Sequence, residues 1–274
     1  MTQSKAVRRG GTGAWSLPVA AVLMAVTSAA FAFGLERLAL WRVVQVCVAN
    51  SKLTGTPFPC LKVDLSGGEE RGDVVLRAPV FNDLILAPTR KIVGVEDPFL
   101  QSPDAPNYFD AAWRSRSFLE AAGRGAPERD QVGLVVNSAV TRSQDQLHIH
   151  VGCVRPAARR SLAAAAPAMP LGQWAPVGAV IPHSAFWGMR VRGTDLTGVE
   201  PFRLAAAALG DRVRNRAVLT IMVAGARVEG DDEFLILASY ASAPHAWRPV
   251  GADDLLDPAC SAETNESEGT RRPR

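Results

Sequence analysis

Polar and apolar residues alternate with a period of two at the centre of the chain. The stretch from Leu134 to Pro156 reads LVVNSAVTRSQDQLHIHVGCVRP, and its middle part, QLHIHV, covers Gln146 to Val151. Alternate side chains of a strand point to opposite faces of a sheet. The pattern therefore predicts a strand that carries Gln146, His148 and His150 on one face. The opposite, buried face is then formed by Leu147, Ile149 and Val151.

The flanking segments carry helical and strand periodicities. Apolar residues at helical spacing predict three helices, over Leu35–Ala49, Tyr108–Ala122 and Ala157–Ala168. Asn107 is the expected N-cap of the second helix, and Trp113 and Phe118 on its apolar face are expected in the core. Short apolar runs between turn residues predict five strands: Asp73–Arg77, Leu84–Ala87, Gln131–Val136, Ala217–Ala224 and Phe234–Tyr240. The last two are expected to form a hairpin, so that a second α+β half follows the central strand.

The N-terminus carries a long uncharged run behind a basic tail. Trp15–Leu35 contains no charged residue and follows Lys5, Arg8 and Arg9. A run of this length can span a bilayer as a helix, and the positive charge before it places the N-terminus in the cytoplasm. The alternative is a cleaved signal peptide, because Ala30-Phe31-Ala32 has the small-x-small form of a cleavage site. Both interpretations predict that the rest of the chain is exported.

Composition narrows the functional classes. A chain of 274 residues with 47% hydrophobic residues suits one or two domains with an ample core. The net charge of +3, with arginines spread along the chain, argues against a dedicated nucleic-acid binder. The sequence contains no Gly-rich phosphate loop and no G-x-S-x-G nucleophile elbow.

The cysteines agree with export. An even set of four cysteines in an exported chain predicts two disulfides, for which three pairings are possible. We favour Cys47 with Cys60, which closes a short loop containing proline, and Cys153 with Cys260, which ties the tail to the central strand. The alternative is four free thiols in a reducing compartment.

A longer pattern surrounds the two histidines. From Asn137 to Pro156 it reads NS-x-x-x-R-x-Q-x-x-x-HIH-x-x-C-x-RP. Histidines that alternate with apolar residues after a polar loop resemble the histidine triad (HIT) superfamily of nucleotidyl hydrolases and transferases. The longer pattern is similar to one branch, the membrane-anchored bacterial CDP-diacylglycerol pyrophosphatases. The resemblance implies an α+β, HIT-like fold with an antiparallel sheet and packed helices. It divides the chain into a cytoplasmic tail (1–14), a transmembrane anchor (15–35), a catalytic domain (36–260) and a disordered tail (261–274).

The same resemblance implies a substrate and a location. Members of this branch hydrolyse CDP-diacylglycerol to CMP and phosphatidate. A site tethered just outside the bilayer meets lipid head groups at a high effective concentration. We therefore expect a single-pass protein of the inner membrane with its catalytic domain on the periplasmic face. Its expected partners are the lipid nucleotide and the bilayer, and no nucleic acid.

The central residues suit the cleavage of a phosphoanhydride. A neutral imidazole can attack phosphorus and form a covalent intermediate, which divides one difficult step into two. His148, at the middle position of the pattern, is the expected nucleophile, and His150 is expected to donate to the leaving phosphate. The scheme needs no metal and no cofactor. Hydrogen-bond donors to the phosphates are expected from the preceding residues: Asn137, Ser138, Arg142, Ser143, Gln144 and Gln146.

Several features leave other interpretations open. Gln146 occupies the first histidine position of the triad, and glutamine cannot exchange a proton at neutral pH. A His-x-His pair on a strand can also bind zinc, although the residues that follow it offer no carboxylate. His183 is a further candidate for the site, whereas His245 and a thiolate at Cys153 are weaker candidates. Two functional alternatives are a transferase that passes CMP to an acceptor other than water and a non-enzymatic protein on a degenerate HIT scaffold.

Overall fold

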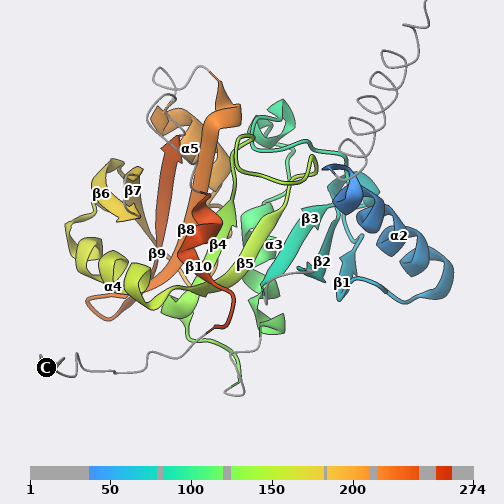
Figure 1. The fold of residues 1–274 in the computed structure, drawn as a ribbon, viewed down its shortest axis with the longest axis horizontal. Helices are drawn as coiled ribbons and strands as arrows, with labels where there is room; N and C mark the ends of the chain where they lie inside the picture. The colour runs from blue at the N-terminus through green and yellow to red at the C-terminus, as the bar shows by residue number, and fades with distance from the viewer. Residues whose placement is uncertain are drawn as a thin grey trace, which may run out of the picture.

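One antiparallel sheet runs through the described residues of the computed structural model, which are 37–78, 83–119, 125–181, 184–209, 215–240 and 251–260. Nine strands follow the order β1-β2-β3-β5-β4-β8-β9-β7-β6, and β10 pairs with β5 from outside this path (Figure 1). The strands are β1 (Lys62–Asp64), β2 (Asp73–Arg77), β3 (Leu84–Pro88), β4 (Val132–Val136), β5 (Ile149–Val154), β6 (Ala175–Ile181), β7 (Ser184–Arg192), β8 (Leu219–Val228), β9 (Asp231–Tyr240) and β10 (Leu256–Asp257). The strand with the histidines, β5, is therefore an interior strand between β3 and β4.

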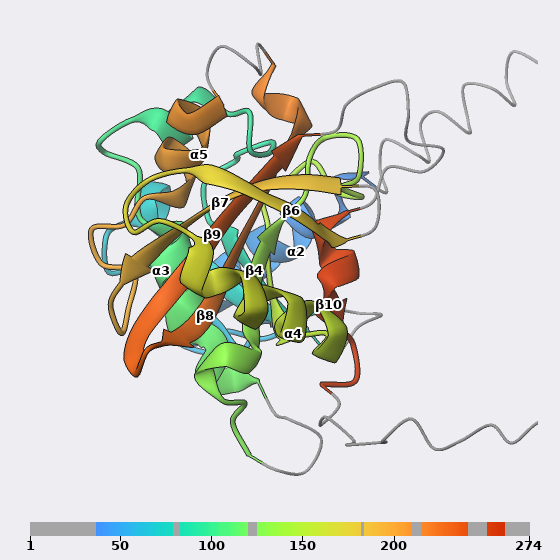
Figure 2. The ribbon, with the colours of Figure 1, turned by 90° about the vertical axis from the view of Figure 1, so that its left-hand side faces the viewer.

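Helices α3 (Tyr108–Ser115) and α5 (Pro201–Leu209) cover one face of the sheet (Figure 2). Phe109 and Trp113 of α3 are buried there in the largest core cluster. The apolar positions of the central pattern lie in the same cluster: Leu147, Ile149 and Val151. The predicted buried face of the central stretch is thus confirmed, and burial of this kind is the main stabilising term in such a layer.

The opposite face carries two smaller clusters with a gap in the middle. Helix α2 (Ala39–Thr54) packs over β2 and β3, and helix α4 (Pro156–Ala165) packs in a cluster with residues of β8 and β9 (Figure 1). His150 pairs with Ile85 of the first cluster on one side and with Val135 of the second on the other. The histidine face of β5 therefore lies between two helix-covered regions.

The fold confirms most predicted elements and corrects several boundaries. The β2–β3 and β8–β9 hairpins are present, and Asn107 caps α3 by accepting from the Asp110 N–H at 3.0 Å. The helix predicted over 108–122 ends at Ser115, and a 3-10 turn (Arg116–Phe118) follows. The Ser115 hydroxyl donates to the Ala112 carbonyl at this helix end. Trp113 is buried and Phe118 packs against the same cluster, as expected. The stretch rich in proline and glycine after α4, for which no element was predicted, contains β6 and β7.

The central strand also begins later than predicted. It was expected from Gln146, whereas β5 starts at Ile149. The Gln146 side-chain amide donates to the backbone carbonyls of Pro88 and Arg90. The Leu147 N–H donates to the Ile92 carbonyl at 2.6 Å. These contacts replace the regular ladder with β3, so the three residues before β5 form an extended turn beside the strand end.

Both favoured disulfides are present. Cys47 is bonded to Cys60, and Cys153 of β5 is bonded to Cys260, so none of the four cysteines is free. The second bridge holds the C-terminal segment with β10 beside the histidine strand. The interpretation with free thiols, including a catalytic thiolate at Cys153, is therefore wrong.

The predicted membrane span and both terminal tails lie outside the described residues. From Arg37 onward, no helix that the structure describes is long and apolar enough to cross a bilayer. The anchor at 15–35 and the periplasmic location therefore stay predictions.

Candidate active site

The two histidines lie together on the face of the sheet between the clusters of α2 and α4. His148 directly precedes β5, and His150 is the second residue of the strand. Their ring centroids are 5.1 Å apart, and the ring planes meet at 67°. Two imidazoles at this separation can act on two atoms of one substrate, such as a phosphorus atom and the oxygen that leaves it.

His148 is built as a neutral base. Its Nδ1 lies 2.7 Å from the backbone carbonyl oxygen of Gln146. Because a carbonyl can only accept, Nδ1 carries the hydrogen and Nε2 keeps its lone pair. Burial, with a smaller contribution from the neighbouring His150, lowers the pKa of His148 from 6.5 to about 4. The ring is therefore uncharged at neutral pH, as a nitrogen nucleophile must be.

His150 has a carboxylate where His148 has a carbonyl. Its Nδ1 lies 2.7 Å from Asp83 Oδ2, and both side chains are largely buried. Asp83 immediately precedes β3, and its approach to β5 depends on Gly152, where an added Cβ would lie 3.2 Å from the Asp83 Cβ. The carboxylate can orient the ring and stabilise positive charge on it during proton transfer.

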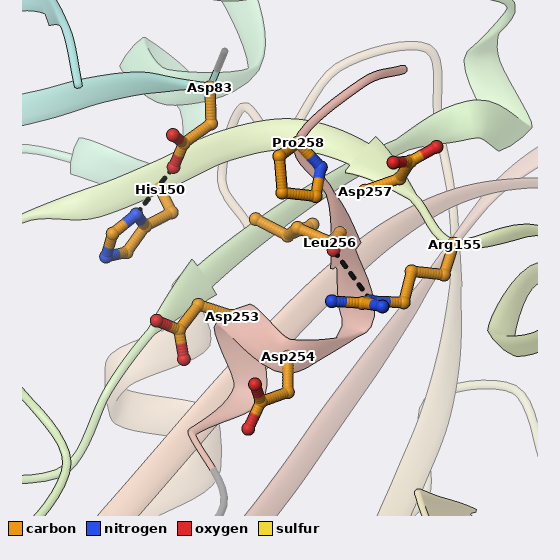
Figure 3. Close-up of a pocket in the computed structure, with 8 residues that line it drawn as sticks. All are labelled: Asp83, His150, Arg155, Asp253, Asp254, Leu256, Asp257 and Pro258. Atoms are coloured by element: carbon orange, nitrogen blue, oxygen red, sulfur yellow. Dashed lines mark hydrogen bonds and ion pairs between the residues drawn. The ribbon is translucent and has the colours of Figure 1, made fainter. Parts of the chain in front are cut away.

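A cavity opens beside His150 where β3 ends its pairing with β5 and β10 begins. Figure 3 shows its lining, with Asp83 and Asp253 on opposite sides of the His150 ring in this view. The lining residues are Asp83, His150, Arg155, Asp253, Asp254, Leu256, Asp257 and Pro258. Arg155 directly follows β5 and donates to the Leu256 carbonyl at 2.9 Å, which ties the end of β5 to β10. His150 is therefore the member of the pair that borders open space here.

Gln146 has a structural role in place of the predicted contact with substrate. The side chain is fully buried, and both hydrogens of its amide are used, one by the Pro88 carbonyl and one by the Arg90 carbonyl, at 2.9 Å each. Its own backbone carbonyl is the acceptor that fixes His148. Glutamine at this position thus anchors the turn that aims the neighbouring ring.

The loop before the histidines places its predicted phosphate donors in different surroundings. Ser138 is fully buried, and its hydroxyl lies 3.1 Å from that of Thr141. Arg142 is also buried, with its guanidinium bound to both oxygens of Glu96 at 2.7 Å and to Asp145 at 3.2 Å. The Arg142 guanidinium therefore already binds two carboxylates, so its role in phosphate binding stays a prediction.

The remaining predicted donors border two different neighbours. Asn137 is buried, and an added Cβ at Gly251 would lie 3.0 Å from its Oδ1. This residue therefore lies at the start of the segment that carries Asp253 and Asp254 of the cavity lining. Gln144 accepts from the Leu40 N–H of α2 at 2.9 Å, whereas Ser143 is exposed. The structure therefore places Asn137 beside Gly251 and directs Gln144 toward α2.

Comparison with known proteins assigns the chain to a family. A family profile described as CDP-diacylglycerol pyrophosphatase matches residues 35–264, which include every residue of the site. The chain belongs to this family. The CDP-diacylglycerol pyrophosphatase of Yersinia pestis is 34% identical over 232 residues, covering 81% of this chain and 83% of that protein. A probable CDP-diacylglycerol pyrophosphatase of Mycobacterium leprae (strain TN) is 29% identical over 230 residues, covering 82% and 81%.

In this CDP-diacylglycerol pyrophosphatase family member, sequence reasoning missed the carboxylates around His150. Asp83 directly precedes the predicted strand Leu84–Ala87 and was not predicted as a site residue, although a carboxylate just before a strand that pairs with the histidine strand is a usable signal. Asp253 and Asp254 carry no local signal, because the Cys153–Cys260 bridge brings them to the site. His183 and His245 lie outside the described residues.

Metal binding was the main alternative for the two histidines. The described parts of the chain contain no group of three or more His, Cys, Asp or Glu side chains that could hold a metal ion. The short contact of His150 is with Asp83, and that of His148 is with a backbone carbonyl.

Proposed function

We propose that this protein hydrolyses the phosphoanhydride of CDP-diacylglycerol to give CMP and phosphatidate. The observation that carries the proposal is the buried, uncharged ring of His148, held by a backbone carbonyl beside the His150–Asp83 pair. Membership of the CDP-diacylglycerol pyrophosphatase family and the names of both relatives support the same substrate. A HIT-like fold, an inner-membrane anchor at 15–35 and a periplasmic catalytic domain belong to this proposal.

The first step is an attack by His148 on the phosphorus that bears cytidine. Its Nε2 lone pair forms the new N–P bond while the bond from that phosphorus to the bridging oxygen breaks. His150 donates its Nε2 proton to the bridging oxygen, so phosphatidate leaves as a weaker base. Asp83 stabilises the charged His150 ring before the transfer and keeps its orientation afterwards.

The second step releases CMP. Water attacks the phosphorus of the nucleotidyl-histidine, and His150, now neutral, takes a proton from that water. The N–P bond breaks, CMP departs, and His148 regains its free lone pair. No step needs a metal or another cofactor. We assign the hydrogen-bond donors that hold the phosphates to Asn137 and to backbone N–H groups and side chains of the loop 137–145. Arg142 can join them if substrate displaces one of its carboxylate partners.

Trapping the intermediate tests the proposal. Protein incubated with CDP-diacylglycerol labelled at the cytidine phosphate is quenched in alkali or in acid and then digested. The expected result is one labelled peptide containing His148, stable in alkali and lost in acid as a phosphoramidate is. An absence of label together with rapid release of CMP would overturn the covalent route, whereas an absence of CMP as well would overturn the hydrolase assignment.

Acceptor competition separates hydrolysis from transfer. Glycerol and other alcohols are added during turnover, and the products are resolved by mass spectrometry. CMP as the dominant product at every alcohol concentration supports water as the acceptor. Accumulation of a CMP ester in proportion to the alcohol would identify the protein as a transferase that uses the same intermediate.

A further inference from the structure

Helix α2 and the loop after it expose an unusual amount of apolar side chain. Four of the large apolar residues exposed in the described chain lie within this one segment: Leu38 (36%), Val46 (54%), Leu53 (85%) and Phe58 (73%). Single exposed apolar residues are normal, but their concentration marks an interaction surface. We call these four residues the apolar strip.

The apolar strip belongs to a rigid part of the fold. The other side of α2 is packed in a core cluster through Leu40, Val44, Cys47 and Val48. The Cys47–Cys60 bridge ties the loop that carries Phe58 to the middle of the helix. The helix therefore has two apolar faces, of which one is covered by the sheet and the other by nothing in the described protein.

Charge indicates what covers the exposed face. From Arg37 to Val63 the chain contains no Asp or Glu, and its charged residues are Arg37, Arg42, Lys52 and Lys62. Arg37, Lys52 and Lys62 pair with Asp145, Glu69 and Asp64 of the same or neighbouring segments. The two lysine pairs are solvent-exposed and therefore weak, so both lysines can exchange their carboxylate for a lipid phosphate and, with Arg42, favour an anionic lipid surface beside the apolar strip.

The same helix is bonded directly to the loop before the histidines. The Arg37 guanidinium pairs with both oxygens of Asp145 at 2.6 and 2.7 Å, and the Asp145 N–H donates to the Arg37 carbonyl at 2.8 Å. The Leu40 N–H donates to Gln144 at 2.9 Å. The exposed face of α2 is therefore connected to the turn that aims His148 through only a few residues.

We propose that α2 and the Cys47–Cys60 loop form an interfacial surface that lies on an anionic bilayer, with the apolar strip inserted among the acyl chains. This surface holds the catalytic loop at the level of the lipid head groups and favours substrates that are embedded in the membrane. The second statement rests on the proposed function, whereas the insertion itself does not.

Insertion is tested on the full chain reconstituted in vesicles of phosphatidylglycerol and phosphatidylethanolamine. Leu53→Cys and Phe58→Cys are each labelled with an environment-sensitive fluorophore, and Leu171→Cys is the matched control, because Leu171 is exposed (43%) near the opposite end of the sheet. Labels at 53 and 58 should shift to the blue and be quenched by lipid-borne nitroxides, whereas the label at 171 should be quenched by iodide. Iodide quenching at all three positions would overturn the proposal. Label–label contact between copies, seen as concentration-dependent excimer emission, would do the same.

Kinetics test the consequence for catalysis. The double variant Leu53→Ser, Phe58→Ser should need a roughly tenfold higher surface concentration of long-chain CDP-diacylglycerol for half-saturation, with turnover at saturation unchanged. Hydrolysis of a short-chain, water-soluble analogue should be unaffected, and Leu171→Ser should match the wild type on both substrates. Equal losses on both substrates would refute a role in lipid docking. A wild type that cleaves neither substrate would refute the proposed function but leave the insertion result standing.

Discussion

His148 and His150 are two residues apart on the same face of the sheet, yet their surroundings differ. His148 is buried, and its Nδ1 meets a backbone carbonyl at 2.7 Å. His150 borders a cavity, and its Nδ1 meets the Asp83 carboxylate at the same distance. A neutral acceptor and burial favour an uncharged ring, whereas a carboxylate can orient the ring and stabilise positive charge on it while a proton is transferred.

The difference teaches that the partner of Nδ1 decides what Nε2 can do. A strand with alternating histidines supplies two identical rings at fixed spacing, and the residues behind them assign the roles. In this chain those residues are the Gln146 backbone and Asp83, which come from different elements. We therefore expect the two histidines to fail in different ways when they are changed.

The largest expected effect comes from removing His148, the proposed nucleophile. His148→Ala should lower hydrolysis of CDP-diacylglycerol by at least about 10³-fold, because no other group can form the covalent intermediate. The measurement is CMP release in mixed micelles, with circular dichroism to show that the fold persists. Activity above a few per cent of the wild type would contradict the assignment of His148.

Replacing the proton donor should give a smaller loss that depends on the leaving group. His150→Gln should lower hydrolysis of CDP-diacylglycerol by roughly 10²-fold or more, the usual contribution of a general acid. The p-nitrophenyl ester of CMP has a leaving group that needs no proton, so the first release of p-nitrophenol by the same variant, before water attacks the intermediate, should stay within about tenfold of the wild type. His148→Ala should cleave neither substrate. Equal losses on both substrates in His150→Gln would show that His150 acts in some other way than as an acid.

The depressed pKa of His148 predicts a stability difference with pH. The folded protein takes up this proton near pH 4, and the unfolded chain takes it up near 6.5. The unfolded state therefore binds more protons between these values, so the contribution is complete above pH 6.5 and is lost as the pH falls toward 4. Relative to His148→Gln, the wild type should lose roughly 3 kcal/mol of unfolding free energy across this window.

The comparison with His148→Gln separates the pH dependence due to His148 from that of groups with the opposite effect on stability. Burial raises the pKa of Asp73 to about 6, and this carboxyl stabilises the folded state as the pH falls, the opposite sign. Urea unfolding of both proteins at several pH values measures the difference, in which Asp73 cancels. A difference that is constant from pH 7 to pH 4 would show that His148 titrates alike in both states.

The sequence predicts the local parts of this arrangement well. Period-two alternation is enough to place His148 and His150 on one face, because the pleat of a strand dictates it. Two disulfides were also placed correctly from chain position alone. The strands β6 and β7 escaped detection because proline and glycine interrupt them. Pro176 is tolerated in β6 because β6 is the edge strand of the sheet, where an N–H is not needed.

Long-range partners were the part that the sequence did not predict. The Gln146 side chain reaches carbonyls more than fifty positions earlier in the chain, and Asp83 reaches His150 across 67 positions. The Arg142 guanidinium was predicted to bind phosphate because its partner Glu96 lies in another loop, which the local pattern does not include. Local patterns identify which residues can react, whereas the tertiary fold decides which of them have partners.

The smallest effect is expected at Asp83, which acts only through His150. Asp83→Asn keeps the shape but turns the acceptor into an amide that can donate to Nδ1, which leaves Nε2–H on a neutral ring and weakens it as an acid. Hydrolysis of CDP-diacylglycerol should fall roughly tenfold, a part of the general-acid contribution, with little change in the first release of p-nitrophenol from the ester. Asp130→Asn, which breaks a partly exposed ion pair with Arg159, is the matched control and should not change either rate. The buried Asp83 Oδ1 has no hydrogen-bond partner in the described part of the chain, so the variant loses no contact at that oxygen and is expected to fold. If Asp83→Asn slowed both substrates equally, the carboxylate would be a structural support, and the contrast between the two histidines would lose its second half.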